Sequence, residues 1–303
     1  MPALCFGTLA ISPLQRAITP AQGAELLAYA AAKGVTIADT AEYYNTYAPL
    51  NLALQTYPNL RVCTKSYAFD TASAARSVRK AQSELARNTL DLFLLHEQEN
   101  ELTLRGHKPA LDYYRSLKST GDISAVGIST HRVAGVKAAI KFQLDAVLAP
   151  LNIDGLGLTD GSRSDMENAL RDAKNNNMFI MIMKVLGGGH SIARRDESLQ
   201  YALSLDFVDA IAIGMASKAE IDYNVALFNG ESPSPQAASD SASAPRILMI
   251  EEGCVGCGNC ARRCGQHAIV MRDGLAVALP DRCVRCGYCA AVCPEYCIKI
   301  VAG

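Results

Sequence analysis

Two runs of cysteine near the C-terminus constrain the fold more than any other feature of this chain. Of eleven cysteines, nine lie between Cys254 and Cys297, and the spacing C-x₂-C-x₂-C-x₃-C occurs twice with an offset of 29 residues. A secreted, disulfide-stapled protein would be short and would carry cysteines throughout. The clustering therefore indicates a metal site, and the repeat indicates a small module of two similar halves.

The spacing lets three thiolates of one loop surround a cubane cluster, while the fourth cysteine reaches a second cluster. Residues 246–303 resemble the bacterial two-cluster ferredoxins on these runs, including Pro294 after the second run, although Gly265 stands at the matching place in the first. The resemblance implies two 4Fe–4S clusters. It assigns one cluster to Cys254, Cys257, Cys260 and Cys293, and the other to Cys283, Cys286, Cys289 and Cys264.

Structural zinc is the alternative for these cysteines, but zinc sites use two well separated C-x₂-C pairs rather than runs of four. Cys297 aligns with Ala268 of the other half, so we expect it to fill a small apolar slot. Cys5 and Cys63 lie inside apolar runs, and we expect both in the core.

A Ser-, Ala- and Pro-rich segment, NGESPSPQAASDSASAP, precedes the cysteine module at residues 229–245. It has no apolar period with which to bury a face, so we interpret it as an interdomain linker. A disordered regulatory segment is the alternative. The predicted organisation is a barrel domain at residues 1–230, a linker at 231–245 and the module at 246–303.

Residues 1–230 alternate short, almost continuously apolar runs with amphipathic stretches such as ASAARSVRKAQSELARN. Such runs are typical of parallel strands covered on both faces. Eight units predict a (β/α)₈ TIM barrel of the α/β class. An open doubly wound sheet would show a Gly-rich turn after its first strand, and FGTLAIS lacks one. The predicted strands are residues 3–6, 35–39, 60–65, 90–96, 123–129, 144–150, 178–184 and 208–214.

Four polar residues lie at or just after the ends of consecutive predicted strands: Asp39, Tyr44, Lys65 and His96. The C-terminal ends of barrel strands carry the chemistry of this fold, so we expect these side chains to converge. Taken singly, each has a plain structural explanation, for example a helix cap for Asp39 or a solvated strand end for Lys65. Tyr43 is the neighbouring tyrosine that competes with Tyr44.

The stretches DTAEYYN, TKS and LDLFLLH resemble the Asp, Tyr, Lys and His motifs of the aldo-keto reductase family, and the resemblance covers residues 1–230. It implies that Tyr44 is a general acid toward a carbonyl oxygen. The ammonium of Lys65 would lower the pKa of Tyr44, and Asp39 would hold Lys65 in place. His96 would orient the carbonyl by a hydrogen bond.

The same resemblance, together with a Gly-rich loop at 184–190, implies a set of nicotinamide contacts. Four family positions differ. Thr130 stands where the family has asparagine after serine, and Leu148, Met183 and Glu220 stand where it has glutamine, an aromatic residue and arginine. The carboxylate of Glu220 would repel a 2′-phosphate, so NADP is disfavoured, while binding of NAD(P)(H) as such stays open. The implied contacts are Ser129, Thr130, Asn152, Lys184, Gly187, Gly188 and Asn224.

The loop KVLGGGH follows the seventh predicted strand and resembles the MKPLGGG-like stretch of aldo-keto reductases that carry ferredoxin modules. TIM barrels often bind phosphate after strands seven and eight, and glycines let backbone N–H groups approach an anion. A plain flexible loop is the alternative. Two nearby residues stay open: His131 as a pocket residue or a helix start, and Glu97 as a substrate contact or a solvated acid.

The formal net charge of −1 gives no indication of nucleic-acid binding. The module has seven basic and five acidic side chains, or +2, which leaves −3 for the rest of the chain and favours folding of the module onto the barrel. No apolar run is long enough to span a bilayer, and the N-terminus lacks a signal-peptide pattern. We therefore expect a cytoplasmic protein without membrane contact.

These features predict an iron–sulfur oxidoreductase that reduces a carbonyl or oxidises an alcohol of a small molecule, with electrons passing through two 4Fe–4S clusters and exchanged with a redox partner protein. Nicotinamide passes two electrons as hydride, whereas each cluster passes one. No flavin motif is visible to couple them. Two alternatives remain: a ferredoxin-driven reductase without nicotinamide, and a non-catalytic electron-transfer subunit whose barrel is a docking scaffold.

Overall fold

The predicted barrel is confirmed by the computed structural model, which describes residues 1–15, 18–243, 246–264, 266–283 and 289–302. Eight parallel strands close in the order β1 to β8, and β8 returns to pair with β1. The strands are β1 (Ala3–Gly7), β2 (Ile37–Asp39), β3 (Arg61–Ser66), β4 (Leu90–Leu95), β5 (Ile123–Ser129), β6 (Ala146–Pro150), β7 (Phe179–Met183) and β8 (Ala210–Gly214).

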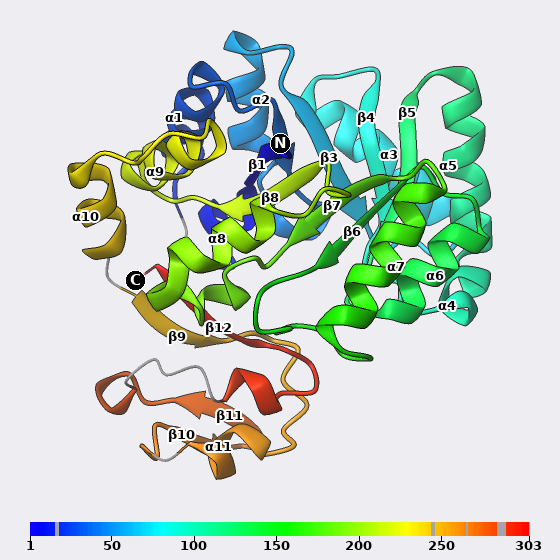
Figure 1. Ribbon diagram of the computed structural model, residues 1–303. Helices are drawn as coiled ribbons and strands as arrows, with labels where there is room; N and C mark the ends of the chain where they lie inside the picture. The colour runs from blue at the N-terminus through cyan, green and yellow to red at the C-terminus, as the bar shows by residue number, and fades with distance from the viewer. Residues whose placement is uncertain (16–17, 244–245, 265, 284–288, 303) are drawn as a thin grey trace.

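Helices surround this barrel (Figure 1). Four of them start with a reciprocal capping box, in which the N-cap side chain accepts a backbone N–H of the first turn; the N-cap residues are Thr19, Asp70, Asn100 and Ser162. The helices are α1 (Pro20–Ala32), α2 (Tyr47–Thr56), α3 (Thr71–Leu85), α4 (Glu101–Gly106), α5 (Lys108–Thr120), α6 (Val133–Lys141), α7 (Arg163–Asn175), α8 (Arg195–Leu203) and α9 (Lys218–Phe228), with 3₁₀ turns η1 (Thr8–Ile11), η2 (Glu42–Tyr44), η3 (Gly187–Gly189) and η4 (Ile192–Arg194).

Two apolar layers hold the barrel together. A large cluster lies between the strands and the helices, and a smaller one fills the interior of the barrel. Cys5 and Cys63 belong to the interior cluster and are buried beside Leu94 and Met181, as expected for core cysteines. Leu148 is also fully buried in this layer, so the position where the family has glutamine presents no polar group.

The segment interpreted as a linker contains a helix, α10 (Pro235–Ser243). Ser234 caps it by accepting the N–H of Ala237, and Ser241 is buried and accepts a hydrogen bond from Arg195 at 2.7 Å. The expectation that this segment cannot bury a face is therefore wrong for these residues, because small side chains pack closely without forming an apolar stripe. The domain boundaries stay a prediction.

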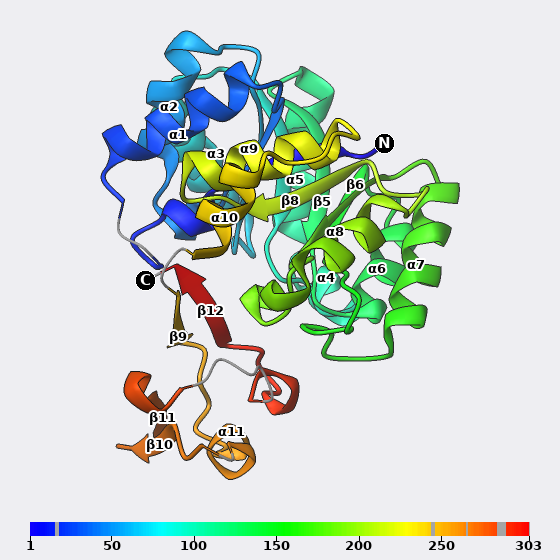
Figure 2. The ribbon, with the colours of Figure 1, turned by 60° about the vertical axis from the view of Figure 1, so that its left-hand side comes forward.

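The C-terminal module is built from two antiparallel pairs of strands. β9 (Arg246–Ile250) pairs with β12 (Ile298–Ala302), and β10 (Ile269–Arg272) pairs with β11 (Leu275–Ala278). In Figures 1 and 2 the β9–β12 pair lies next to the barrel, while β10, β11 and helix α11 (Asn259–Arg263) lie farther away. Within the described residues, no helix has both the length and the apolar character needed to cross a membrane.

Candidate active site

The four residues predicted from the strand ends come together at the mouth of the barrel. Asp39 ends β2, Tyr44 ends η2 in the loop that follows, Lys65 lies in β3, and His96 follows β4 directly. All four line one cavity of about 860 Å³. The Lys65 ammonium is buried and donates to Asp39 Oδ1 at 2.7 Å and to the carbonyl of Thr40 at 2.6 Å. The expected pairing of Asp39 with Lys65 is therefore present.

Tyr44 lies between this ion pair and His96. The Lys65 Nζ atom is 4.9 Å from the centroid of the Tyr44 ring, and the rings of Tyr44 and His96 meet edge to face with centroids 5.8 Å apart. The chain turns away immediately afterwards, because Asn45 adopts a left-handed conformation with φ 54°. Tyr43 is exposed instead and donates to Glu252 of the module at 3.0 Å, so it does not take the place of Tyr44 beside Lys65.

Burial dominates the ionisation of these groups. Burial raises the pKa of Tyr44 to about 12, and the Lys65 ammonium offsets this only in part. Burial also opposes the charge on Lys65, but Asp39 and Tyr44 outweigh it, so the pKa of Lys65 is raised. The expected direction of the Lys65 effect on Tyr44 is correct, whereas the expectation of a lowered net pKa is wrong. Tyr44 is therefore protonated at neutral pH.

His96 is a neutral side chain in a wall of aromatic groups. Its burial, followed by the charges of Lys65 and Lys184, holds the pKa of His96 well below its usual range. Its ring stacks on Tyr67 with centroids 4.4 Å apart, and Tyr67 donates to Glu97 at 2.7 Å. In the described part of the chain, the buried Nδ1 of His96 has no hydrogen-bond partner. Sequence reasoning missed Tyr67, for which the two-residue spacing from Lys65 was the available signal.

The predicted nicotinamide contacts do not gather as one set. Ser129 lines the cavity, but its hydroxyl accepts the N–H of Glu97 at 2.9 Å. Thr130 is fully buried, and its hydroxyl accepts the N–H of Arg132 at 3.0 Å. Both hydroxyls thus accept a backbone N–H of the loop after their own or the neighbouring strand.

The two predicted asparagines also bond to their own surroundings. Asn152 is fully buried and donates to the carbonyls of Leu156 at 2.7 Å and Lys184 at 3.1 Å. Asn224 donates to the carbonyl of Glu220 one helical turn earlier, at 2.8 Å. Neither asparagine lines the cavity.

Lys184 and His131 form a second polar group at the cavity wall. Lys184 Nζ lies 3.0 Å from His131 Nε2 and 4.7 Å from the centroid of the Tyr296 ring. Burial, and then the charge of Lys299, hold the pKa of Lys184 well below its usual range. His131 therefore faces the cavity rather than starting a helix, since helix α6 begins at Val133.

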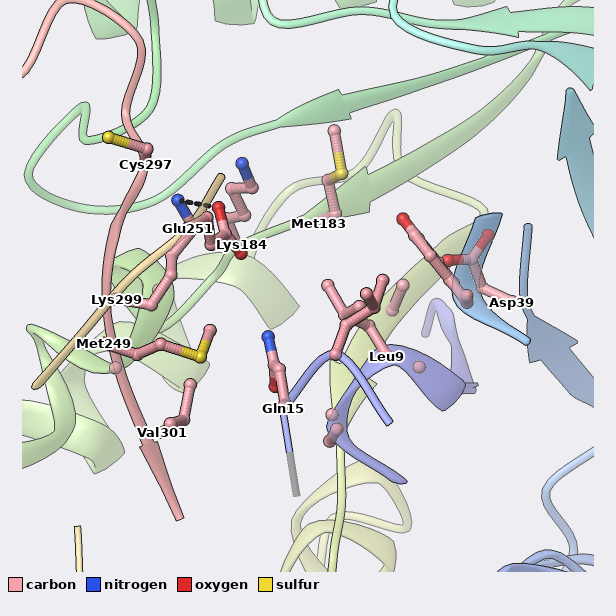
Figure 3. A pocket seen from close by; sticks show the side chains of 18 of the residues that line it. Leu9, Gln15, Asp39, Met183, Lys184, Met249, Glu251, Cys297, Lys299 and Val301 are labelled. Carbon is pink, nitrogen blue, oxygen red and sulfur yellow. Dashed lines mark ion pairs between the residues drawn. The ribbon is translucent and has the colours of Figure 1, made fainter. Parts of the chain in front are cut away.

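The module forms the opposite wall of the same cavity. Figure 3 shows Met249, Glu251, Cys297, Lys299 and Val301 on one side and Asp39 across from them. Lys299 Nζ pairs with Glu251 at 3.1 Å. Sequence reasoning missed these residues as cavity residues, because they are far from the barrel strands along the chain.

Four predicted ligands come together beside this wall. The thiols of Cys254, Cys257, Cys260 and Cys293 line one hollow. Cys297 is 3% exposed and its sulfur lies 3.4 Å from that of Cys293, so it is a buried neighbour of the hollow.

Of the other predicted set, Cys264 and Cys283 lie near enough to act electrostatically on Cys289, and Cys286 lies outside the described residues. No three His, Cys, Asp or Glu side chains in the described ranges are grouped to hold one metal ion. The four cysteines of the first set line one small hollow, and their assignment to one cubane stays a prediction.

A barrel whose mouth gathers Asp, Tyr, Lys and His side chains beside a cysteine module defines an iron–sulfur oxidoreductase. The aldo/keto reductase family model matches residues 3–198, and the model of a 4Fe-4S dicluster domain matches residues 246–295. The chain therefore belongs to the aldo/keto reductase family and carries an iron–sulfur domain after its barrel. No match was found among curated proteins.

Solved structures share the barrel at low sequence identity. A protein from Pseudomonas aeruginosa, described as an aldo-keto reductase, is 22% identical, with a TM-score of 0.63 over 78% of this chain and 90% of its own. An aldo-keto reductase from Bacillus halodurans, in its holo form, is 16% identical with a TM-score of 0.63, covering 78% and 89%. The glycerol dehydrogenase of Gluconobacter oxydans is 17% identical with a TM-score of 0.60, covering 79% and 90%. These similarities show the fold.

Proposed function

We propose that this oxidoreductase reduces the carbonyl group of a small molecule bound at the mouth of the barrel, with electrons supplied through the module. One observation carries the proposal. The cavity that contains Asp39, Tyr44, Lys65 and His96 is closed on its other side by Cys297, next to a hollow lined by four cysteines. Proton donors and the electron-transfer module thus meet at one substrate-sized space.

Reduction of a carbonyl to an alcohol consumes two electrons and two protons. Tyr44 donates one proton to the carbonyl oxygen as negative charge develops there, and Lys65 stabilises the phenolate that remains. Solvent supplies the second proton, which forms the C–H bond at the carbonyl carbon, and then returns a proton to Tyr44. Asp39 fixes the position of Lys65 through the 2.7 Å contact. The neutral ring of His96 orients the carbonyl by donating an N–H to its oxygen.

The protonated state of Tyr44 favours reduction over oxidation. A phenol with a pKa of about 12 is protonated at neutral pH and can donate to an alkoxide, which is a much stronger base. The reverse reaction needs the phenolate, whose population at neutral pH is very small. We therefore propose that Tyr44 acts as the general acid for carbonyl reduction at neutral pH, and that catalysis of the reverse reaction needs higher pH.

Cys254, Cys257, Cys260 and Cys293 would hold the cluster nearest the cavity, and Cys264, Cys283, Cys286 and Cys289 would hold the second. When bound, each cluster supplies one electron at a time. Ile250, Glu295 and Cys297 line both the cavity and the first hollow, so a single layer of side chains separates the two spaces. A reduced redox protein is the proposed electron source, and the cytoplasm is the proposed location, because cubanes are lost in oxidising surroundings.

The proposal is tested with anaerobic protein, dithionite or reduced ferredoxin as the donor, and a panel of aldehydes and ketones. Product alcohol is measured by mass spectrometry. His96→Ala should lower the rate by about 10²- to 10³-fold, as loss of one preorganised donor to a developing oxyanion does. His107→Ala is the matched control, because His107 bonds to the carbonyl of Thr103 outside the cavity. Equal rates in the two variants would contradict the proposed role of His96 and would favour the alternative in which the barrel is a docking scaffold.

A further inference from the structure

The β9–β12 strand pair, here called the ribbon (residues 246–250 and 298–302), packs directly on the glycine-rich turn η3. A methyl group added at Gly189 would lie 2.0 Å from the carbonyl oxygen of Ile300, and one added at Gly188 would lie 2.9 Å from Lys299 Cδ. His190 Nε2 is 3.1 Å from the carbonyl oxygen of Ile298. The glycines of this loop are thus needed for the approach of a protein strand.

A second contact fixes the other strand of the ribbon. Arg246 pairs with Glu220 of α9 at 3.3 Å, and both side chains are mostly buried, at 13% and 14% exposure. Glu220 is the acid that stands where the family has an arginine for phosphate. Here it binds a cation supplied by the module of the same chain.

Four backbone N–H groups of this region already have acceptors within the barrel. The N–H groups of Gly187 and Gly189 donate to the carbonyls of Lys184 and Leu186. At the start of α9, the N–H of Glu220 donates to Ser217, and the N–H of Ala216 donates to the Glu220 carboxylate at 2.7 Å. TIM barrels bind phosphate with the loops after strands seven and eight. In this chain an anion at these loops would meet the carboxylate of Glu220, and the four N–H groups named above are not free to bind it.

We infer that the ribbon takes the place of a nicotinamide dinucleotide in this barrel, so that the protein binds neither NADH nor NADPH at the cavity. Reducing equivalents then enter from the side of the module, which forms the wall opposite Asp39. The residues present do not fit a dinucleotide, because Lys299 and Ile300 pack on the glycine turn and Arg246 is paired with Glu220 at the start of α9. This inference goes beyond the proposed carbonyl chemistry, since occupancy of the site is measured without turnover.

The first test is equilibrium titration of the anaerobic full-length holoprotein with NADH and with NADPH, followed by calorimetry and nicotinamide fluorescence. The expected result is no saturable binding up to about 1 mM, the upper end of common KM values. Saturable binding of either nucleotide in the micromolar range overturns the inference.

The second test measures docking of the ribbon by hydrogen exchange in the full-length holoprotein. Gly189→Ala should speed exchange of the ribbon amides by about tenfold or more, because the added methyl group collides with Ile300. Gly121→Ala is the matched control, since its φ of +87° resembles the +91° of Gly189 but nothing lies within 4 Å. Equal exchange in the two variants overturns the inference. Should Gly189→Ala not fold, Arg246→Gln replaces it with the same expected acceleration.

Discussion

Replacement of Tyr44 by phenylalanine tests the role of the hydroxyl group without changing the packing of the cavity. The phenyl ring keeps the 4.9 Å contact with Lys65 Nζ and the 5.8 Å edge-to-face contact with His96, and only the hydroxyl is lost. No hydrophobic volume is removed, so we expect the free energy of unfolding to change by less than about 1 kcal/mol. The clusters, whose proposed ligands all lie in the module, should be retained in full.

The catalytic effect of Tyr44→Phe should be large. General acid catalysis contributes about 10²- to 10⁴-fold, which corresponds to about 2.7–5.4 kcal/mol of activation free energy. The assay is anaerobic reduction of the best carbonyl substrate by reduced ferredoxin, with iron content and melting temperature measured on the same samples. Tyr113→Phe on the outer helix α5 is the matched control and should react at the wild-type rate. A rate for Tyr44→Phe within about threefold of wild type, with iron intact, would refute the role of Tyr44.

Three further predictions follow from the same geometry. Anaerobically purified protein should contain about eight iron and eight sulfide ions, and Cys293→Ser should lose about half of them; about two zinc ions without sulfide would contradict the cluster assignment. Lys65→Met should lower the free energy of unfolding by about 3–5 kcal/mol in chemical denaturation, because it leaves Asp39 buried without its cation, and Asp39→Asn added to it should restore most of the loss. The rate of carbonyl reduction should not fall between about pH 6 and pH 9, because Tyr44 stays protonated below its pKa of about 12, whereas alcohol oxidation should rise about tenfold for each pH unit. A reduction rate that drops near neutral pH in the pH profile would show that Tyr44 is not the acid.

The barrel could be predicted because its signals are local and redundant. Each strand is buried on both faces, so runs such as LDLFLLH are nearly continuous in apolar residues, and eight of them close the sheet. The convergence of Asp39, Lys65 and His96 then follows from barrel geometry, because the C-terminal ends of all parallel strands meet at one rim. The cysteine runs were equally informative, since ligand spacing within one loop is read directly from the sequence.

The role of the glycine loop could not be predicted in the same way. A backbone without Cβ atoms approaches an anion or a protein strand equally well, so Gly188 and Gly189 carry no information about which partner is present. The packing of Ile300 against Gly189 is decided by residues more than a hundred positions away in the chain. The carboxylate of Glu220 was the one sequence signal, and it indicated repulsion of phosphate without revealing Arg246 as its partner.

The net pKa of Tyr44 could not be predicted from the sequence either. The motif around Lys65 indicates that this ammonium lowers the pKa of Tyr44. Burial raises that pKa, and the extent of burial depends on how the ribbon and the barrel close the cavity. Helix α10 was missed for a related reason. Its buried face consists of small residues such as Ala237 and Ser241, which have no apolar periodicity to detect.

The central claim is that electrons pass from the module to a carbonyl held in the barrel cavity without nicotinamide. The most direct measurement is a single turnover: protein reduced with dithionite, freed of excess reductant and mixed anaerobically with a carbonyl substrate, followed by cluster absorbance and electron paramagnetic resonance. We predict oxidation of both clusters with about one alcohol formed for each pair of electrons, and no such oxidation in Tyr44→Phe. Clusters that stay reduced in the presence of a substrate that NADH or NADPH alone converts would contradict the account.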